Sequence, residues 1–126
     1  MSFAHGRDLS ERIIGLAIEV HRQLGPGLLE ATYEECLCFE LSQAGIPFGR
    51  QLPLPVVYKD VRLDCGYRVD IAVGQDVIVE INAVERLLAI HDAQVLTYLR
   101  LSGRKIGLLM NFNTTLLKDG LRRFVM

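Results

Sequence analysis

The segment from Asp70 to Asn82 constrains the fold of this chain most strongly, because a carboxylate interrupts an apolar β-like run. Glu80 lies within residues 77–81, whose other members are Val and Ile. Burying an unpaired carboxylate is costly, so Glu80 is expected to have a partner such as a metal ion, a base or a strong donor. A second carboxylate, Asp70, belongs to the preceding apolar run, and a turn that contains Gly74 separates the two runs.

This pair of carboxylates suits a divalent cation. Side chains alternate along a strand, so Glu80 and Asn82 share a face. The short turn makes the two runs antiparallel neighbours, which allows Asp70 to join that face. Two acidic groups and the carbonyl after Glu80 are ligands that suit Mg²⁺ or Mn²⁺, with waters completing the shell. Taken singly, Asp70 also fits a strand-end turn and Glu80 also fits an edge strand that faces water.

Composition sets the broad class of the protein. With 126 residues, half of them hydrophobic, the chain is expected to form one domain spanning 1–126. The formal net charge of −1 gives no bulk argument for nucleic-acid binding. No apolar run reaches the roughly 18 residues of a membrane span, and the N-terminus has no apolar signal region. Three cysteines in such a chain are interpreted as reduced thiols, so a cytoplasmic protein is expected.

The periodicity predicts an α/β or α+β domain with a mixed β-sheet flanked by helices. Two helices joined by Gly25-Pro26-Gly27 form an N-terminal helical hairpin, and a near-continuous apolar strand at 106–112 is expected to be central. The helix between the last two main strands suggests a parallel crossover. The predicted order is ααββββαβ with a possible final strand: helices near 9–24 and 28–44, strands at 48–58, 61–63, 67–73 and 77–82, a helix at 90–101, and strands at 106–112 and 121–125.

Several blocks of sequence resemble one family along nearly the whole chain. The segment from Gly27 to Tyr33, Gly-Leu-Leu-Glu-Ala-Thr-Tyr, matches the signature of the GxxExxY proteins. That family is similar to the PD-(D/E)XK nuclease superfamily. The other blocks follow the same layout: Glu19 to Gly27, Tyr67 to Asp70, Val79 to Ala83, His91 to Leu99, and Gly107 to Phe112.

The resemblance implies a restriction-endonuclease-like core and roles for particular residues. Asp70 and Glu80 would be the metal carboxylates, and Glu30 would be an additional acidic site residue. Gln94 and Tyr98 resemble the QxxxY element of RecB-type nucleases, which helps to hold the substrate or the site. From spacing alone, Gln94 and Tyr98 share a helix face and also fit ordinary packing, and Glu30 also fits a first-turn helix glutamate.

One position departs from the superfamily pattern. The third element is E-x-K, whereas this chain has Glu80-Ile81-Asn82. The lysine normally orients the attacking water and stabilises charge on the phosphate. Asn82 can hold a water through hydrogen bonds but carries no charge. Lys59 or Lys105 could supply the missing cation from another strand.

The resulting prediction is a nuclease-fold protein that acts on nucleic-acid phosphodiesters, DNA rather than RNA, with Mg²⁺ or Mn²⁺. Its candidate catalytic residues are Glu30, Asp70, Glu80, Asn82, Gln94 and Tyr98. The replacement at position 82 leaves open an impaired enzyme. The alternative is an inactive domain of the same fold that binds nucleic acid or forms an oligomeric scaffold. A chain of this size could form a homodimer to span a duplex, and no membrane partner is expected.

Overall fold

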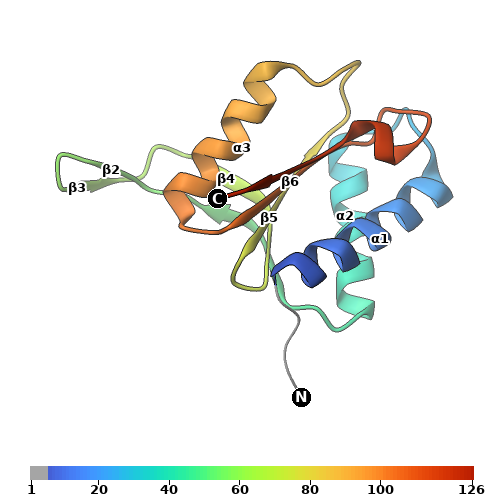
Figure 1. Ribbon diagram of the computed structural model, residues 1–126, viewed down its shortest axis with the longest axis horizontal. Helices are drawn as coiled ribbons and strands as arrows, with labels where there is room; N and C mark the ends of the chain where they lie inside the picture. The colour runs from blue at the N-terminus through green and yellow to red at the C-terminus, as the bar shows by residue number, and fades with distance from the viewer. Residues whose placement is uncertain (1–5) are drawn as a thin grey trace.

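The architecture is a mixed β-sheet between two layers of helices, and the computed structural model of the protein describes residues 6–126 (Figure 1). The elements are α1 (Gly6–Leu24), α2 (Glu30–Gln43), β1 (Phe48–Pro53), β2 (Val56–Tyr58), β3 (Val61–Leu63), β4 (Arg68–Val73), β5 (Val77–Asn82), α3 (Ala89–Ser102), β6 (Ile106–Asn111), the short 3₁₀ helix η1 (Leu117–Gly120) and β7 (Leu121–Val125).

The main sheet has the strand order β1-β4-β5-β6-β7. β5 and β6 pair in parallel through the α3 crossover, and the other neighbours are antiparallel. The predicted fold class, the parallel crossover and the final strand are therefore confirmed. The prediction of one strand over 48–58 is wrong, because the chain leaves the main sheet near Pro53 and Pro55. Since proline cannot donate to a ladder, the run divides into β1 and β2.

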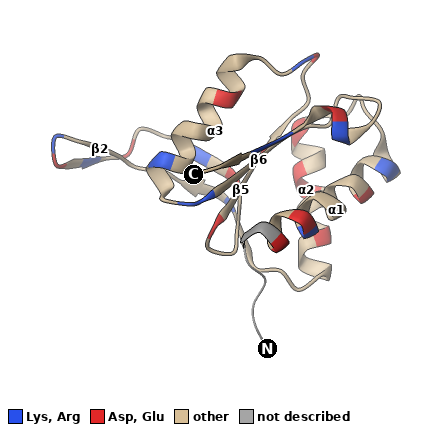
Figure 2. Cartoon of the chain, in the orientation of Figure 1, with Lys and Arg blue, Asp and Glu red and all other residues tan. Residues whose placement is uncertain are grey.

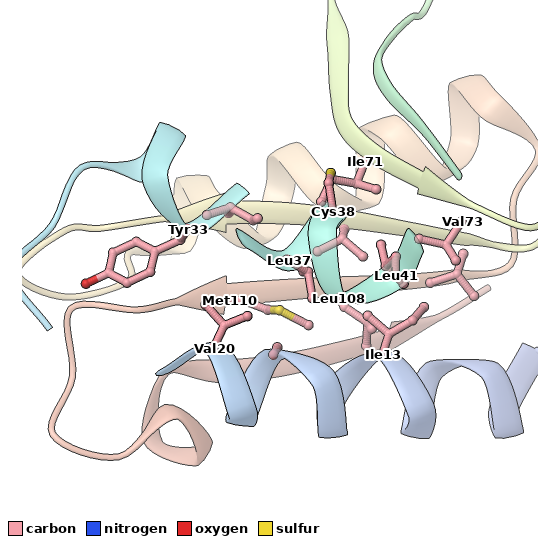
Figure 3. Packing of buried hydrophobic residues seen from close by; sticks show 14 of the residues in the cluster. Ile13, Val20, Tyr33, Leu37, Cys38, Leu41, Ile71, Val73, Leu108 and Met110 are labelled. Atoms are coloured by element: carbon pink, nitrogen blue, oxygen red, sulfur yellow. The ribbon is translucent and has the colours of Figure 1, made fainter. Parts of the chain in front are cut away.

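The larger core lies between the sheet and the helical hairpin of α1 and α2. Ile13, Ala17 and Val20 recur at helical spacing on α1 and are buried there against the sheet. Figure 3 shows side chains of α1 and α2 meeting those of β4 and β6 in this layer. The residues of β6 are all buried, as expected for a strand covered on both faces.

The smaller core lies on the opposite face, beneath α3. Val95 and Leu99 pack on Ile78 of β5 and Leu109 of β6. The helix approaches β6 closely at Gly107, where an added Cβ would come within 2.5 Å of a Val95 methyl group. A glycine is therefore required for α3 to dock at this depth.

β2 and β3 form a separate two-stranded sheet that projects from the body of the molecule (Figure 1). Its turn residues Lys59 and Asp60 both have positive φ, 49° and 66°, as two-residue hairpins require. Among residues 6–126, no helix is long and apolar enough to cross a membrane.

Candidate functional site

The two predicted metal carboxylates lie on neighbouring strands where the β4–β5 ladder ends. The last register pair on this side is Ile71 with Val79, so Asp70 is opposite Glu80. Beyond that pair, the Asp70 side chain replaces a backbone carbonyl as the acceptor: its Oδ2 accepts a hydrogen bond from the Ile81 N–H at 2.8 Å. The geometry thus brings Asp70 and Glu80 together at the point where the strands separate.

Glu80 is buried within the otherwise apolar run of β5 and is only 7% exposed. Within the described part of the chain, its Oε1 is the one fully buried side-chain oxygen or nitrogen without a hydrogen-bond partner. Burial, followed by the neighbouring Asp70 carboxylate, raises the pKa of Glu80 to about 10. An orphaned carboxyl oxygen beside a second carboxylate is the environment that a divalent cation would satisfy.

A third carboxylate, Glu34 of α2, contacts the same Gln51 amide as Asp70 and was not predicted as a site residue. Its side chain is buried and accepts hydrogen bonds from Arg50, at 2.9 Å from Nη2, and from Nε2 of Gln51, at 3.1 Å. The charge of Glu34 also contributes to the raised pKa of Glu80. In the sequence, Glu34 carries one weak signal, which is its position one helical turn after Glu30.

Gln94 and Tyr98 are brought together on α3, which covers the sheet face that carries Ile78 and, two residues further along β5, Glu80. Nε2 of Gln94 donates to the Tyr98 hydroxyl at 2.9 Å. Burial raises the pKa of Tyr98, and the charges of Glu80 and Asp70 raise it further. The ring of Tyr67 lies edge-on to that of Tyr98, with centroids 6.2 Å apart. Tyr98 therefore adjoins the carboxylate pair, while Gln94 stands one turn away and orients its hydroxyl.

Glu30 lies at the exit of β5, where it contacts the backbone that follows the strand. Its Oε2 accepts a hydrogen bond from the Ala83 N–H at 3.1 Å. Tyr33 supports this placement: its hydroxyl donates to the Gly25 carbonyl at 2.6 Å and accepts from the Leu28 N–H. Tyr33 thus secures the glycine-rich turn from which Glu30 begins α2.

Asn82 ends β5, partly exposed, two residues beyond Glu80 on the same face of the strand. Neither proposed replacement lysine lies beside it. Lys59 sits at the tip of the projecting hairpin, over the ring of Tyr58. Lys105 precedes β6 next to the start of β5, about 13 Å along the strands from the Glu80 level at about 3.3 Å per residue. The possibility that one of these lysines supplies the missing cation is therefore not realised in this structure.

The donors fit a hard cation that takes few protein ligands. No three Asp, Glu, His or Cys side chains converge as a metal cluster within residues 6–126. Mg²⁺ is commonly held by one or two carboxylates and keeps several waters. Asp70, Glu80 and the Ile81 carbonyl meet that requirement. Charged positions are otherwise spread over separate elements, so no single basic face marks a nucleic-acid surface in this view (Figure 2).

Comparison with known protein families identifies the superfamily of the chain from its sequence. A family model described as the PD-(D/E)XK nuclease superfamily matches residues 7–124. The chain matches no curated protein and no solved structure. The match covers almost every element described above, including both candidate metal carboxylates, and the narrower resemblance to GxxExxY proteins stays a prediction.

Proposed function

The chain belongs to the PD-(D/E)XK nuclease superfamily, and we propose that it hydrolyses nucleic-acid phosphodiesters with a divalent metal ion. Members of this superfamily are nucleases that generally use such ions. The observation that carries the proposal is the pairing of half-buried Asp70 with buried Glu80, in which Oε1 of Glu80 has no partner among the described residues. DNA is the substrate we expect.

Each site residue has a role that follows from its place. Asp70 and Glu80 would hold Mg²⁺ or Mn²⁺, and the carbonyl of Ile81 would be a third protein ligand. When bound, the ion supplies charge stabilisation at the phosphate and lowers the pKa of a nearby water. Asn82 would orient the attacking water by hydrogen bonding. As the water oxygen bonds to phosphorus, one phosphorus–oxygen ester bond breaks and the leaving oxygen takes up a proton from solvent water. Glu30 fixes the chain just after β5.

Tyr98, oriented by Gln94, forms the α3 side of the site. Its hydroxyl adjoins the carboxylate pair and can donate to a carboxylate or to a substrate oxygen. Because the phenol is partly buried and its pKa is raised, it stays protonated at neutral pH. This arrangement supports a role in holding the substrate rather than in proton transfer.

Cleavage of labelled single- and double-stranded DNA and RNA tests the proposal. We would compare the native chain with Glu80→Gln and, as a matched control, with Asp76→Asn, which removes a carboxylate from the opposite end of β5. The expected result is cleavage by the native chain and the control that needs Mg²⁺ or Mn²⁺ and falls by about a hundredfold or more in Glu80→Gln. Equal cleavage by Glu80→Gln would contradict the proposal.

A second candidate function is nucleic-acid binding without turnover, and Asn82 in the place of the motif lysine favours it. This form would keep the metal carboxylates and the substrate surface but lack the positive charge at the phosphate. It predicts metal-dependent binding of DNA by the native chain together with no cleavage. The predicted homodimer can be tested alongside by analytical ultracentrifugation.

A further inference from the structure

We propose that Gln51 is a positioning residue, held in a strained backbone conformation so that its amide ties the buried Glu34 to Asp70. Asp70 is thereby fixed in the orientation needed for a divalent ion. This inference rests on the proposed function and extends it to two residues that have no role there, Gln51 and Glu34.

The first observation is the backbone of β1. Arg50 pairs with Ile71 and Leu52 pairs with Val69, so Gln51 is the strand residue opposite Asp70. At this point φ is +52°, the left-handed region that L residues other than Gly, Asn and Asp rarely occupy. The other described non-glycine residues with positive φ, Lys59 and Asp60, are at a hairpin turn that requires it.

No turn accounts for the conformation of Gln51, which lies in the middle of a strand. The pairing of β1 with β4 keeps the same register before and after Gln51, so no extra residue has been inserted as a bulge. Strained residues of this kind persist where the surroundings over-determine them, and they cluster at functional sites. The hydrogen bonds of the Gln51 side chain give the reason for the strained backbone here.

Those contacts are all made to carboxylates. Nε2 of Gln51 lies 3.1 and 3.3 Å from the two oxygens of Glu34 and 3.4 Å from Oδ1 of Asp70. Because carboxylates only accept hydrogen bonds, the amide nitrogen and not its oxygen must face them. Gln51 therefore neutralises part of the repulsion between two acidic groups without bringing in a charge that would compete with a metal ion.

Glu34 gives this bridge a fixed end. The residue is 8% exposed, and its carboxylate is held by Arg50 through Nε at 3.2 Å and Nη2 at 2.9 Å, while Nη1 of Arg50 binds Glu35 at 2.7 Å. Asp70 is held from its other side, where Oδ2 accepts the Ile81 N–H. Both oxygens of Asp70 are thus oriented, one by β5 and one by the chain Arg50–Glu34–Gln51. Such outer hydrogen bonds typically affect metal affinity ten- to a hundredfold.

The test compares Gln51→Gly with Lys59→Gly. Both substitutions relieve a positive φ, but only the first removes the amide between Glu34 and Asp70. Mn²⁺ binding is measured by calorimetry, and thermal unfolding is measured in EDTA. Gln51→Asn, which tolerates the left-handed region but has a shorter reach, is the third variant.

For Gln51→Gly we expect a Kd for Mn²⁺ raised about tenfold or more, with a melting temperature in EDTA no lower than that of the native chain. Gln51→Asn is expected to lose affinity as well, and Lys59→Gly is expected to keep the native Kd. A merely structural role would lower the melting temperature and leave the Kd unchanged.

Native binding with an unchanged Kd in Gln51→Gly overturns this inference and leaves the proposed function standing. No Mn²⁺ binding by the native chain overturns the proposed function, and this inference with it, because there is then no metal site to position. A Kd raised to the same extent in Lys59→Gly also overturns the inference, since relief of strain alone would then explain the change.

Discussion

Asn82 is the residue at which this chain differs from the superfamily pattern. It stands two residues past Glu80 on the same strand face, partly exposed at the end of β5, so a longer side chain can be accommodated. In the metal-bound site we expect Asn82→Lys to raise the cleavage rate by about a hundred- to a thousandfold, the usual worth of one such electrostatic contact. Steady-state cleavage of labelled DNA measures this change.

The matched control for that substitution is Asn113→Lys. It adds the same charge at an exposed position after β6, outside the carboxylate pair. An equal gain in both variants would mean that the added charge merely attracts phosphate, which contradicts a specific role for position 82.

Glu80 makes the stability of the metal-free chain depend on pH. Its pKa is raised from 4.5 to about 10, chiefly by burial, so between these values the folded state binds a proton that the unfolded state releases. The contribution of this carboxyl is therefore complete below about pH 4.5 and declines as pH rises toward 10. Glu80→Gln, which mimics the protonated carboxyl, should be more stable than the native chain at pH 8 by roughly 1–3 kcal/mol.

Thermal unfolding in EDTA at pH 4.5 and pH 8 measures this difference. The advantage of Glu80→Gln should appear at the higher pH and shrink at the lower one, while Asp76→Asn should show no such trend. A variant that is less stable than the native chain at pH 8 would mean that Glu80 is ionised and satisfied in the folded protein.

The sequence allowed the main acidic pair to be predicted but not the residues that support it. Asp70 and Glu80 stand out because carboxylates rarely interrupt apolar strands. Glu34 resembles any helix glutamate until α2 packs beside β1. Gln51 resembles an edge-strand amide, because residue type does not encode a left-handed φ at that position.

At the scale of elements, the docking of α3 on β6 positions Tyr98 beside the carboxylates. Gly107→Ala places a methyl group 2.5 Å from Cγ1 of Val95 and 3.2 Å from a Leu99 methyl. Because the branched Val95 side chain has little rotamer freedom, we expect a loss of about 1–3 kcal/mol of unfolding free energy. Chemical denaturation measures it.

Gly49→Ala in β1 is the control for that prediction. A Cβ at position 49 meets no atom within 4 Å, and the exchange should change the unfolding free energy by less than about 1 kcal/mol. A similar loss in both variants would show that strand glycines matter for the backbone and not for the approach of α3.

Patterning predicted the elements well where an apolar run is nearly continuous, as in β5 and β6. It failed at Pro53 and Pro55, where the run predicted as one strand leaves the main sheet and divides into β1 and β2. Proline marks such a bend without saying in which direction the chain continues, and that depends on the hairpin of β2 and β3 pairing with itself.

At the scale of the whole molecule, the stability resides in the two cores and not in the projecting hairpin. Leu108 is fully buried between β6 and the helical hairpin, whereas Val57 and Val61 of β2 and β3 are 63% and 54% exposed. We expect Leu108→Ala to lose about 2–5 kcal/mol. The pair Val57→Thr and Val61→Thr should change the unfolding free energy by less than about 1 kcal/mol.

Chemical denaturation of these variants gives both values. A large loss on changing the hairpin would show that it packs on another surface, such as that of a second copy of the chain, and protein-concentration dependence of the loss would identify that case. The tertiary core was foreseeable from hydrophobic spacing, but the detachment of the hairpin from the sheet was not.

The proposed function requires that Asp70 and Glu80 together bind a divalent ion. Calorimetric titration of the native chain, Asp70→Asn, Glu80→Gln and the control Asp76→Asn with Mn²⁺ tests it most directly. We expect saturable binding by the native chain and the control, with affinity reduced about tenfold or more in each of the other two variants. Native affinity retained in Glu80→Gln, or no binding by the native chain, would contradict it.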